Sequence, residues 1–308
     1  MLVTIGVASF NNGRYIVKLL DSILNQSYPY IELLIVDDCS TDNSISIIEE
    51  WISANNYPVQ LTRRATNQGV VATFAELRRQ ARGEFTLWIG SDDWLLPHMV
   101  ADTVAEFNRQ GQACGAVYSD CLLVNDTGEV IKPSFLQHFN ARFGPHFPEK
   151  NLRIALLSGF YVPTVTCMVR RHALEQIGPY DLMLHSEDLD TWLRLSMKWQ
   201  FAYLPKVTAA YRVHEKSLTS SSKPSLNETY LLIYKKSNFE QGSELTAAKT
   251  MLAEHAEHYY RSKHRDAASF IYYAYQQTGS LKLLGFWIAA HLGLKHKHLL
   301  KLFSGRIS

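Results

Sequence analysis

The chain has 308 residues, of which 46% are hydrophobic and 19% are charged, a balance typical of a globular protein with a buried core. This composition excludes a disordered chain, a collagen-like chain and a coiled coil. The formal net charge of +2 provides no global basic field for nucleic acid, so an electrostatic function has to come from local clusters.

The first 125 residues alternate between strand-like and helix-like segments. Short apolar runs predict strands at residues 3–8, 31–36, 59–62, 85–89 and 115–118. Helices are expected after the turn at residues 11–13, after the cap at residues 40–42, and over residues 71–82. This alternation predicts an α/β fold in which helices cover both faces of a parallel sheet.

Polar residues stand where several of these strands end. The strands run into Ser9-Phe10-Asn11, Asp37-Asp38, Ser91-Asp92-Asp93 and Ser119-Asp120. Ligands of such sheets bind beyond the carboxyl ends of the strands, so these carboxylates are expected to converge on one edge. Crowded carboxylates repel one another unless a cation neutralises them, and oxygen ligands of this kind suit Mg²⁺ or Mn²⁺ together with a phosphate. The alternative interpretation is that the aspartates only cap helices.

Several common motifs are missing from the sequence. It contains no G-x-x-x-x-G-K-[ST] loop and no G-x-G-x-x-G after a strand, which argues against P-loop kinases and Rossmann dehydrogenases. A bound nucleotide would therefore depend on a metal and on side chains. The cysteines form no Cys-x-x-Cys pair, so free thiols are expected rather than a zinc site or a disulfide framework.

A series of short motifs runs in order from residue 3 to residue 214. They lie at residues 3–12, 20–28, 32–43, 67–69, 81–85, 91–93, 170–181, 186–195 and 211–214. Each motif alone is a weak signal, but the ordered set resembles the family 2 glycosyltransferases. The resemblance implies a GT-A fold, which is a Rossmann-like α/β architecture with a mixed, mainly parallel sheet. It also implies inverting transfer of a sugar from a nucleotide-sugar donor to an acceptor hydroxyl.

The resemblance gives roles to residues at the matching positions. The nucleotide base and ribose would contact Ala8, Phe10, Asn11, Asp38 and, from the next loop, Arg64 or Asn67. Asp92 and Asp93 would hold Mn²⁺ or Mg²⁺ on the donor diphosphate, and His214 lies where relatives contact the diphosphate or the metal. Asp188 would be the general base.

Two departures from the family pattern bear on these roles. Gly90 stands where many relatives have an aspartate, which leaves the metal and ribose ligands to be divided between Asp92 and Asp93. Cys39 replaces the more usual Gly or Asn, and we expect it to be a small buried residue rather than a nucleophile.

An inverting transfer needs two kinds of help. A divalent ion stabilises the charge that develops on the leaving diphosphate, and a base on the opposite face, the role implied for Asp188, takes the proton of the acceptor hydroxyl. From the residues alone, other interpretations stay open. Acidic residues at 187–190 also suit a helix N-terminus, and a lone histidine such as His214 is usually structural. The stretch from Gly159 to Thr164 is either an acceptor pocket or core.

The sequence divides into two expected domains. Residues 1–220 would form the catalytic domain, with a nucleotide-binding half at 1–125 and an acceptor half at 126–220. A Ser- and Lys-rich linker at 217–225 leads into a helical subdomain at 221–308. The end of this subdomain, residues 281–308, is basic and amphipathic, and two interpretations stay open for it: contact with an anionic membrane surface, or packing on the catalytic domain or on a second subunit.

The expected function is that of an inverting glycosyltransferase that uses a UDP-sugar to build a surface polysaccharide, lipopolysaccharide or capsule, with a saccharide or lipid-linked saccharide as acceptor. No signal peptide or spanning segment is evident, so we expect a cytoplasmic protein, peripheral on the inner face of the cell membrane if residues 281–308 bind there. A homo-oligomer stays open, and nucleic acid is not an expected partner. The alternative is a catalytically silent GT-A domain that acts as a binding or scaffold subunit, which only Gly90 favours.

Overall fold

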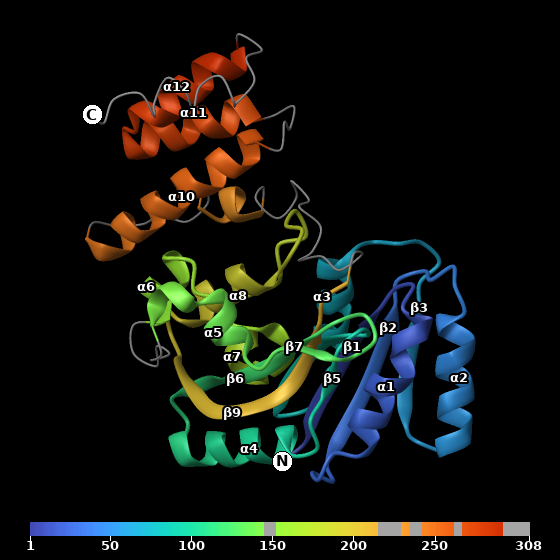
Figure 1. Ribbon diagram of the computed structural model, residues 1–308. Coiled ribbons are helices and arrows are strands. Elements are labelled where there is room, and N and C mark those ends of the chain that lie inside the picture. The colour runs from blue at the N-terminus through green and yellow to red at the C-terminus, as the bar shows by residue number, and fades with distance from the viewer. Residues whose placement is uncertain (145–151, 215–228, 235–241, 262–266, 292–308) are drawn as a thin grey trace.

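The computed structural model describes residues 1–144, 152–214, 229–234, 242–261 and 267–291, and shows a mixed sheet flanked by helices, with further helices beyond it (Figure 1). The strands are β1 (Val3–Ser9), β2 (Ile31–Asp37), β3 (Val59–Arg63), β4 (Phe85–Gly90), β5 (Trp94–Leu95), β6 (Cys114–Val124), β7 (Val130–Lys132), β8 (Met168–Arg170) and β9 (Gln200–Arg212). The α-helices are α1 (Gly13–Leu24), α2 (Ser44–Asn55), α3 (Val70–Gln80), α4 (Met99–Gln110), α5 (Phe135–Phe139), α6 (Leu152–Leu157), α7 (Arg171–Gln176), α8 (Asp188–Leu195), α10 (Ser243–Arg261), α11 (Ala267–Thr278) and α12 (Leu281–His291). Residues 229–234 are also helical.

The sheet has the order β3-β2-β1-β4-β8-β6-β9-β5, and β7 pairs with β6. The strands β3, β2, β1 and β4 are parallel to their neighbours, and β6 is parallel to β9. The short strand β8 is antiparallel to both β4 and β6. Most of the paired residues therefore lie in parallel pairings, and the expected mixed, mainly parallel sheet is confirmed.

Right-handed crossovers explain which helices cover which face of the sheet. The chain moves from β1 to β2 to β3 in one direction, which places α1 and α2 on one face, and it returns past β1 to β4, which places α3 on the other (Figure 1). The apolar residues that recur at helical spacing in α1 are buried, namely Ile16, Leu19, Leu20 and Ile23. Sequence periodicity therefore located both the helix and its buried face.

The second half of the sheet is built on one long parallel pairing, that of β6 with β9, which packs on α4 (Figure 1). The sequence prediction ended the fifth strand at residue 118 and placed Asp120 at the sheet edge. This prediction is wrong, because β6 continues to Val124 and Asp120 is buried within it. The Asp120 carboxylate accepts hydrogen bonds from the Ser134 hydroxyl and the Leu136 N–H, and so fixes the start of α5.

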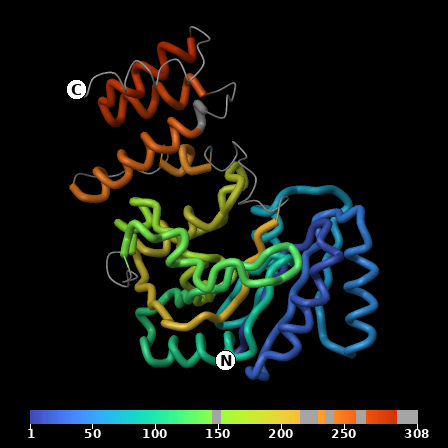
Figure 2. Tube along the Cα trace, in the orientation of Figure 1, coloured from blue at the N-terminus to red at the C-terminus, as the bar shows by residue number. Residues whose placement is uncertain are grey.

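Helices follow β9 and pack against the sheet-bearing part of the chain. The tube in Figure 2 shows α10, α11 and α12 side by side, and α10 also contacts α6. In α12, Leu283, Phe286 and Ala289 are buried, and Lys282 forms an ion pair with Glu257 of α10 at 2.6 Å. Residues 281–291 thus pack against α11 and α10, and both interpretations of the basic end stay predictions. The linker at 217–225 and the rest of the basic end, residues 292–308, lie outside the described residues.

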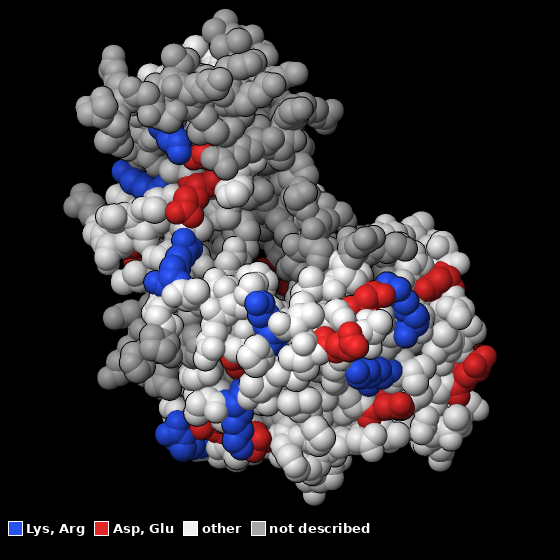
Figure 3. Space-filling model, in the orientation of Figure 1, with Lys and Arg blue, Asp and Glu red and all other residues white. Residues whose placement is uncertain are grey.

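The surface carries no extended field of one sign on the face shown in Figure 3, where acidic and basic side chains are interspersed over the described residues. This face is hollowed between the sheet and the C-terminal helices, and acidic atoms are visible deep in the hollow. Within the described ranges, no helix is both long enough and apolar enough to cross a membrane.

Glu32 ties together the starts of three strands. Its carboxylate accepts hydrogen bonds from the Thr4 hydroxyl of β1 at 2.5 Å, and from the backbone N–H and the guanidinium of Arg82, which precedes β4, at 2.9 and 2.5 Å. Burial raises the pKa of Glu32, but the hydrogen bonds from Thr4 and Arg82 outweigh it and hold the pKa below its ordinary value.

We expect Glu32→Gln to lower the free energy of unfolding by about 1.5–3 kcal/mol at pH 7, because charge-assisted hydrogen bonds to a buried carboxylate are lost. Since the folded-state pKa lies below the unfolded value of 4.5, the contribution of Glu32 is present above that pH and is lost as the pH falls further. Urea unfolding at pH 7 and pH 3 should therefore show that the gap between wild type and variant persists above pH 4.5 and closes below it. Glu50→Gln, at an exposed position of α2, is the control. An equal gap at both pH values would contradict the assignment.

Candidate functional site

The parallel register of β1, β2 and β4 brings their polar ends to one edge of the sheet. Ser9 at the end of β1 pairs with Asp37 of β2, and Ala8 pairs with Gly90 of β4. Residues that are far apart in sequence therefore meet at the carboxyl ends of three adjacent strands, where ligands of parallel sheets bind. The polar residues that follow the first, second and fourth predicted strands share this edge.

The loops after β1 and β2 are fastened to each other. Asp37 is buried, and its carboxylate accepts hydrogen bonds from the hydroxyls of Ser9 at 2.9 Å and Ser40 at 2.6 Å. The side-chain oxygen of Asn11 accepts the Thr41 N–H at 2.7 Å, and the Asn11 N–H donates to the Ser40 hydroxyl at 2.8 Å. These hydrogen bonds hold the two loops against each other in a fixed conformation.

Asp38 holds the loop that follows β3. Its carboxylate forms an ion pair with Arg64 at 3.0 Å and accepts the backbone N–H groups of Gln68 and Gly69 at 2.9 and 2.8 Å. The side chains of Asp38 and Arg64 are both largely buried. The structure thus brings together two residues that the sequence assigned to nucleotide binding, and they also support each other.

The remaining residues assigned to the nucleotide surround the same edge. Ala8 is the last but one residue of β1, Phe10 is 45% exposed just after the strand, and Asn67 is exposed in the loop held by Asp38. Cys39 is half-buried rather than buried as expected, and its thiol donates to the Ala65 carbonyl at 3.4 Å. Its backbone has φ of +68°, a left-handed conformation that glycine and asparagine adopt more readily than other residues.

Asp92 and His214 form a pair at the end of β4. Asp92 Oδ2 lies 3.0 Å from His214 Nε2, although 122 residues separate the two in sequence. The pairing of β5 with β9 brings them together, because Asp92 precedes β5 and His214 follows β9. Gly90 provides the space, since a Cβ atom at this position would lie 2.7 Å from Asp92 Oδ1.

Asp93 has a different environment from Asp92. It is buried and accepts the backbone N–H of Arg212 at 2.8 Å. Burial, and next the charge of Asp92, raise the pKa of Asp93 well above its ordinary value. The Arg212 guanidinium donates to the Asp92 carbonyl at 2.9 Å and lies 4.3 and 5.1 Å from the ring centroids of Tyr15 and Trp94. Asp93 is therefore part of the packing that holds β9, whereas the Asp92 side chain stays 20% exposed.

The divalent ion that the resemblance implies can be tested against these side chains. Over the residues that the structure describes, no group of three or more His, Cys, Asp or Glu side chains surrounds one metal position. Asp92 and His214 supply an oxygen and a nitrogen within 3.0 Å of each other. Mg²⁺ and Mn²⁺ commonly take one or two protein ligands together with water and phosphate oxygens, so this pair fits an ion that also binds a diphosphate.

Glu187 and Asp188 begin α8, and the loop before this helix is held against β4. The Tyr180 hydroxyl accepts the indole N–H of Trp88, a β4 residue, at 2.9 Å. Asp188 Oδ1 accepts the Ser186 hydroxyl and the next backbone N–H, the latter at 2.8 Å. Burial, followed by the charge of Asp188, raises the pKa of Glu187 to about 8. Glu187 is therefore mostly protonated at neutral pH.

The stretch at 159–164 contains both buried and partly exposed residues. Phe160 is buried in the core, whereas Tyr161 is 38% exposed and borders a cavity together with Asp188. Sequence reasoning did not single out the other polar groups at this cavity, which come from Trp192, Tyr230, Tyr234 and His255. Helical periodicity in the sequence shows only which side of its own helix each residue lies on. It does not show that residues from three separate helical segments meet at one cavity.

Comparisons with known proteins identify the family. The sequence pattern described as "Glycosyl transferase family 2" matches residues 4–178, more than half of the chain. TuaG of Bacillus subtilis, a glycosyltransferase named for teichuronic acid biosynthesis, is 25% identical over 233 residues, which are 75% of this chain and 86% of TuaG. TarS of Staphylococcus aureus, named a poly(ribitol-phosphate) beta-N-acetylglucosaminyltransferase, is 31% identical over 125 residues, which are 40% of this chain and 20% of TarS.

Solved structures have the same fold. S. aureus TarS 1-349 in complex with UDP-GlcNAc gives a TM-score of 0.67 at 19% identity, covering 96% of this chain and 93% of that one. The mannosyltransferase PcManGT from Pyrobaculum calidifontis, in complex with GDP-Man and Mn²⁺, gives a TM-score of 0.63 at 18% identity, covering 94% and 79% of the two chains. The expected GT-A fold is thereby confirmed.

The raised pKa of the buried Glu187 predicts how the free energy of unfolding changes with pH. Its folded-state pKa of about 8 lies above the unfolded value of 4.5, so protonation of Glu187 favours the fold below pH 4.5, and this advantage is lost as the pH rises toward 8. Glu187→Gln cannot ionise. Between pH 5 and pH 8, we expect the free energy of unfolding of the variant to rise by more than about 1 kcal/mol relative to that of wild type. Urea unfolding at pH 5, 6.5 and 8 measures this change, which has the opposite sign to that expected for Glu32→Gln. A difference that does not vary with pH would show that Glu187 is not protonated in the fold.

Proposed function

This chain belongs to glycosyl transferase family 2 and is a glycosyltransferase, and we propose that it transfers a sugar with inversion from a UDP-sugar to an acceptor hydroxyl. The observation that carries the proposal is the Asp92–His214 pair at 3.0 Å, which stands at the carboxyl edge of the sheet beside the loops after β1 and β2. An acidic group and an imidazole at this edge suit the diphosphate of a nucleotide sugar bound through a divalent cation.

We propose that the nucleoside lies against the loops after β1, β2 and β3. The exposed ring of Phe10 offers a face for stacking, and the polar groups come from a set that shares this edge: Ala8, Asn11, Asp38, Arg64 and Asn67. UDP as the nucleotide is supported by TarS, whose structures contain UDP and UDP-GlcNAc, while PcManGT of the same fold contains GDP-Man. The UDP-sugar is therefore the donor that we would test first.

In this proposal Asp92 and His214 hold Mn²⁺ or Mg²⁺, and Asp93 holds the strand that carries His214. When bound, the ion stabilises the negative charge that develops on the leaving diphosphate. The partly exposed Asp92 carboxylate faces the edge where the diphosphate would lie, whereas Asp93 is engaged by the Arg212 N–H. These contacts support Asp92 rather than Asp93 as the metal ligand, the choice that Gly90 leaves open.

We propose that Asp188 is the general base. Both of its hydrogen bonds go to Oδ1, from the Ser186 hydroxyl and the next N–H, which leaves Oδ2 without a hydrogen bond from the described residues. That oxygen can accept the proton of the acceptor hydroxyl as the hydroxyl attacks the sugar. Protonation of Glu187 removes the like charge that would otherwise oppose the ionised Asp188.

We propose a saccharide or lipid-linked saccharide of a cell-surface polymer as the acceptor. TuaG is named for teichuronic acid biosynthesis and TarS for poly(ribitol-phosphate) modification, and both names point to polymers of this kind. We further propose that residues 1–220 form the catalytic domain and residues 221–308 a helical subdomain, because the last strand of the sheet ends at Arg212. Gly90 does not favour a silent scaffold, since it makes the space that Asp92 occupies.

Replacing the proposed base should separate binding from chemistry. We expect Asp188→Asn to lower the rate of transfer at least about 1,000-fold, because the acceptor hydroxyl keeps its proton, while UDP affinity changes less than about twofold. UDP release from a panel of UDP-sugars measures turnover, and thermal shifts with UDP and Mn²⁺ measure binding. Asp102→Asn, on α4, is the matched surface control. Transfer at more than a tenth of the wild-type rate in Asp188→Asn would remove Asp188 from the mechanism.

A methyl group at residue 90 should disturb the metal site. Because a Cβ atom at Gly90 would lie 2.7 Å from Asp92 Oδ1, we expect Gly90→Ala to displace the Asp92 carboxylate from His214. The Mn²⁺-dependent part of UDP affinity should fall about tenfold, while binding without Mn²⁺ is unchanged. Thermal shifts with UDP, with and without Mn²⁺, give both values. In an Asp92→Ala background the same substitution should add nothing, and an additive loss there would mean that Gly90 acts by another route.

A further inference from the structure

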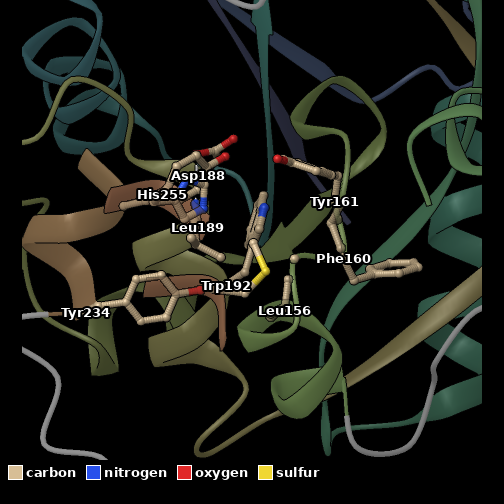
Figure 4. Close-up of a pocket in the computed structure, with 12 residues that line it drawn as sticks. Leu156, Phe160, Tyr161, Asp188, Leu189, Trp192, Tyr234 and His255 are labelled. Atoms are coloured by element: carbon tan, nitrogen blue, oxygen red, sulfur yellow. Dashed lines mark hydrogen bonds between the residues drawn. The ribbon is translucent and has the colours of Figure 1, made fainter. Parts of the chain in front are cut away.

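A cavity lies beside Asp188, and the C-terminal helices form part of its wall (Figure 4). Its lining comes from α6 and the turn after it, from α8, from residues 229–234 and from α10. The residues are Leu156, Gly159, Phe160, Tyr161, Val162, Asp188, Leu189, Trp192, Tyr230, Tyr234, Met251 and His255. The cavity is partly open, and its volume of about 20 Å³ is room for a water-sized group and not for a sugar ring.

Trp192 gives this cavity a hydrogen-bond donor that the protein does not use. The side chain is buried, with 4% of its surface exposed, and its Nε1–H has no hydrogen-bond partner among the residues described. In Figure 4 the indole stands on the cavity wall between Asp188 and Tyr161. Leaving a buried donor without an acceptor is destabilising, so such a group in a cavity points to an acceptor supplied from outside.

The other walls are aromatic and uncharged. The His255 ring stacks on Tyr230 with centroids 4.3 Å apart, and burial lowers the pKa of His255 to about 3, so the imidazole is neutral. The hydroxyls of Tyr161 and Tyr230 are hydrogen-bonded to each other, and the Tyr234 hydroxyl donates to the Leu157 carbonyl at 3.2 Å. Among the lining residues, Asp188 is the one acidic side chain.

We propose that this cavity receives a neutral hydroxyl group of the acceptor sugar, carried on the ring or on its hydroxymethyl carbon, and that the Trp192 Nε1–H donates to its oxygen. The inference rests on the proposed function, because it places the acceptor next to the base Asp188. Aromatic walls suit the C–H groups of a sugar, and the single donor suits one oxygen. A carboxylate or phosphate on the same substituent is disfavoured by the negative charge of Asp188.

The consequence concerns acceptor choice. Tyr230, Tyr234, Met251 and His255 come from residues 229–234 and from α10, whereas the loops that the nucleoside would contact follow β1, β2 and β3. The C-terminal helices thus supply a wall of the acceptor subsite, and none of these four residues is among those proposed to bind the donor. Trp192 is the positioning residue of this subsite, and Met251 limits its depth.

Binding of simple glycosides tests the proposal in the full-length protein. Methyl β-glycosides of glucose, galactose, GlcNAc, GalNAc and glucuronic acid are titrated in the presence of UDP and Mn²⁺, with saturation-transfer NMR as the readout. At least one neutral glycoside should bind in the millimolar range, and the glucuronide should bind at least about fivefold more weakly than the glucoside. Absence of any neutral binder, or equal binding of the glucuronide, would overturn the proposal.

Two substitutions locate the subsite. Trp192→Phe keeps an aromatic side chain and removes the N–H, so glycoside affinity should fall about fivefold or more while UDP affinity stays within twofold. Met251→Phe fills the cavity from α10 and should abolish glycoside binding with the same unchanged UDP affinity. Trp199→Phe is the matched control, because the Trp199 Nε1–H is also without a hydrogen-bond partner in the described chain but lies outside this cavity.

The outcomes separate this inference from the proposed function. Wild-type binding of glycosides that neither Trp192→Phe nor Met251→Phe weakens would overturn the subsite and leave the glycosyl transfer intact. If Trp192→Phe fails to fold, as judged by its thermal transition, Met251→Phe decides alone. A wild-type protein that binds no UDP and turns over no UDP-sugar would instead overturn the proposed function.

Discussion

Repulsion between carboxylates is the constraint on which the candidate site depends. Parallel pairing places Asp37, Asp38, Asp92 and Asp93 at one edge of the sheet, and each negative charge has to be compensated. Hydroxyl groups surround Asp37, and Asp38 has Arg64 together with two backbone N–H groups. Burial favours the protonated form of Asp93. Asp92 alone among the four is partly exposed with an imidazole as its neighbour, so it is the carboxylate best placed for an ion that arrives with the substrate.

Arg212 connects this edge of the sheet to neighbouring parts of the fold. Its backbone N–H binds the Asp93 carboxylate, and its guanidinium binds the carbonyl groups of Asp92, Asn125 and Asp126 while lying over the ring of Tyr15. One side chain thus joins the end of β9 to α1 and to the turn after β6. Because His214 stands two residues further along the chain, its distance from Asp92 is set by strand pairing and by this packing rather than by the loop that follows.

The sequence predicted those parts of the molecule that local patterns encode. Apolar periodicity located the strands from β1 to β4 and the helices between them, and the motif order led to the family. The different burial of Asp92 and Asp93 could not be predicted, because neighbouring aspartates look alike in sequence. Only the pairing of β5 with β9 shows which of the two is buried. The end of the fifth strand was wrong for a related reason: Asp120 looks like a strand end, yet Ser134 and Leu136 satisfy its buried carboxylate from outside the local sequence. The positive φ of Cys39 likewise depends on a turn that composition does not show.

The two sides of the site differ in how the chain builds them, and this difference has a functional consequence. Apart from His214, which the pairing of β5 with β9 brings to Asp92, the edge that faces the proposed donor uses consecutive strands and loops, from β1 to β4, so its shape is fixed by the parallel sheet and by short hydrogen-bonded loops. The cavity beside Asp188 needs α6, α8, residues 229–234 and α10, which meet only through long-range packing. A substitution in α10 can therefore reshape the space next to Asp188 without altering any bond at the sheet edge. On physical grounds, a chain organised in this way can change its acceptor while it keeps its donor.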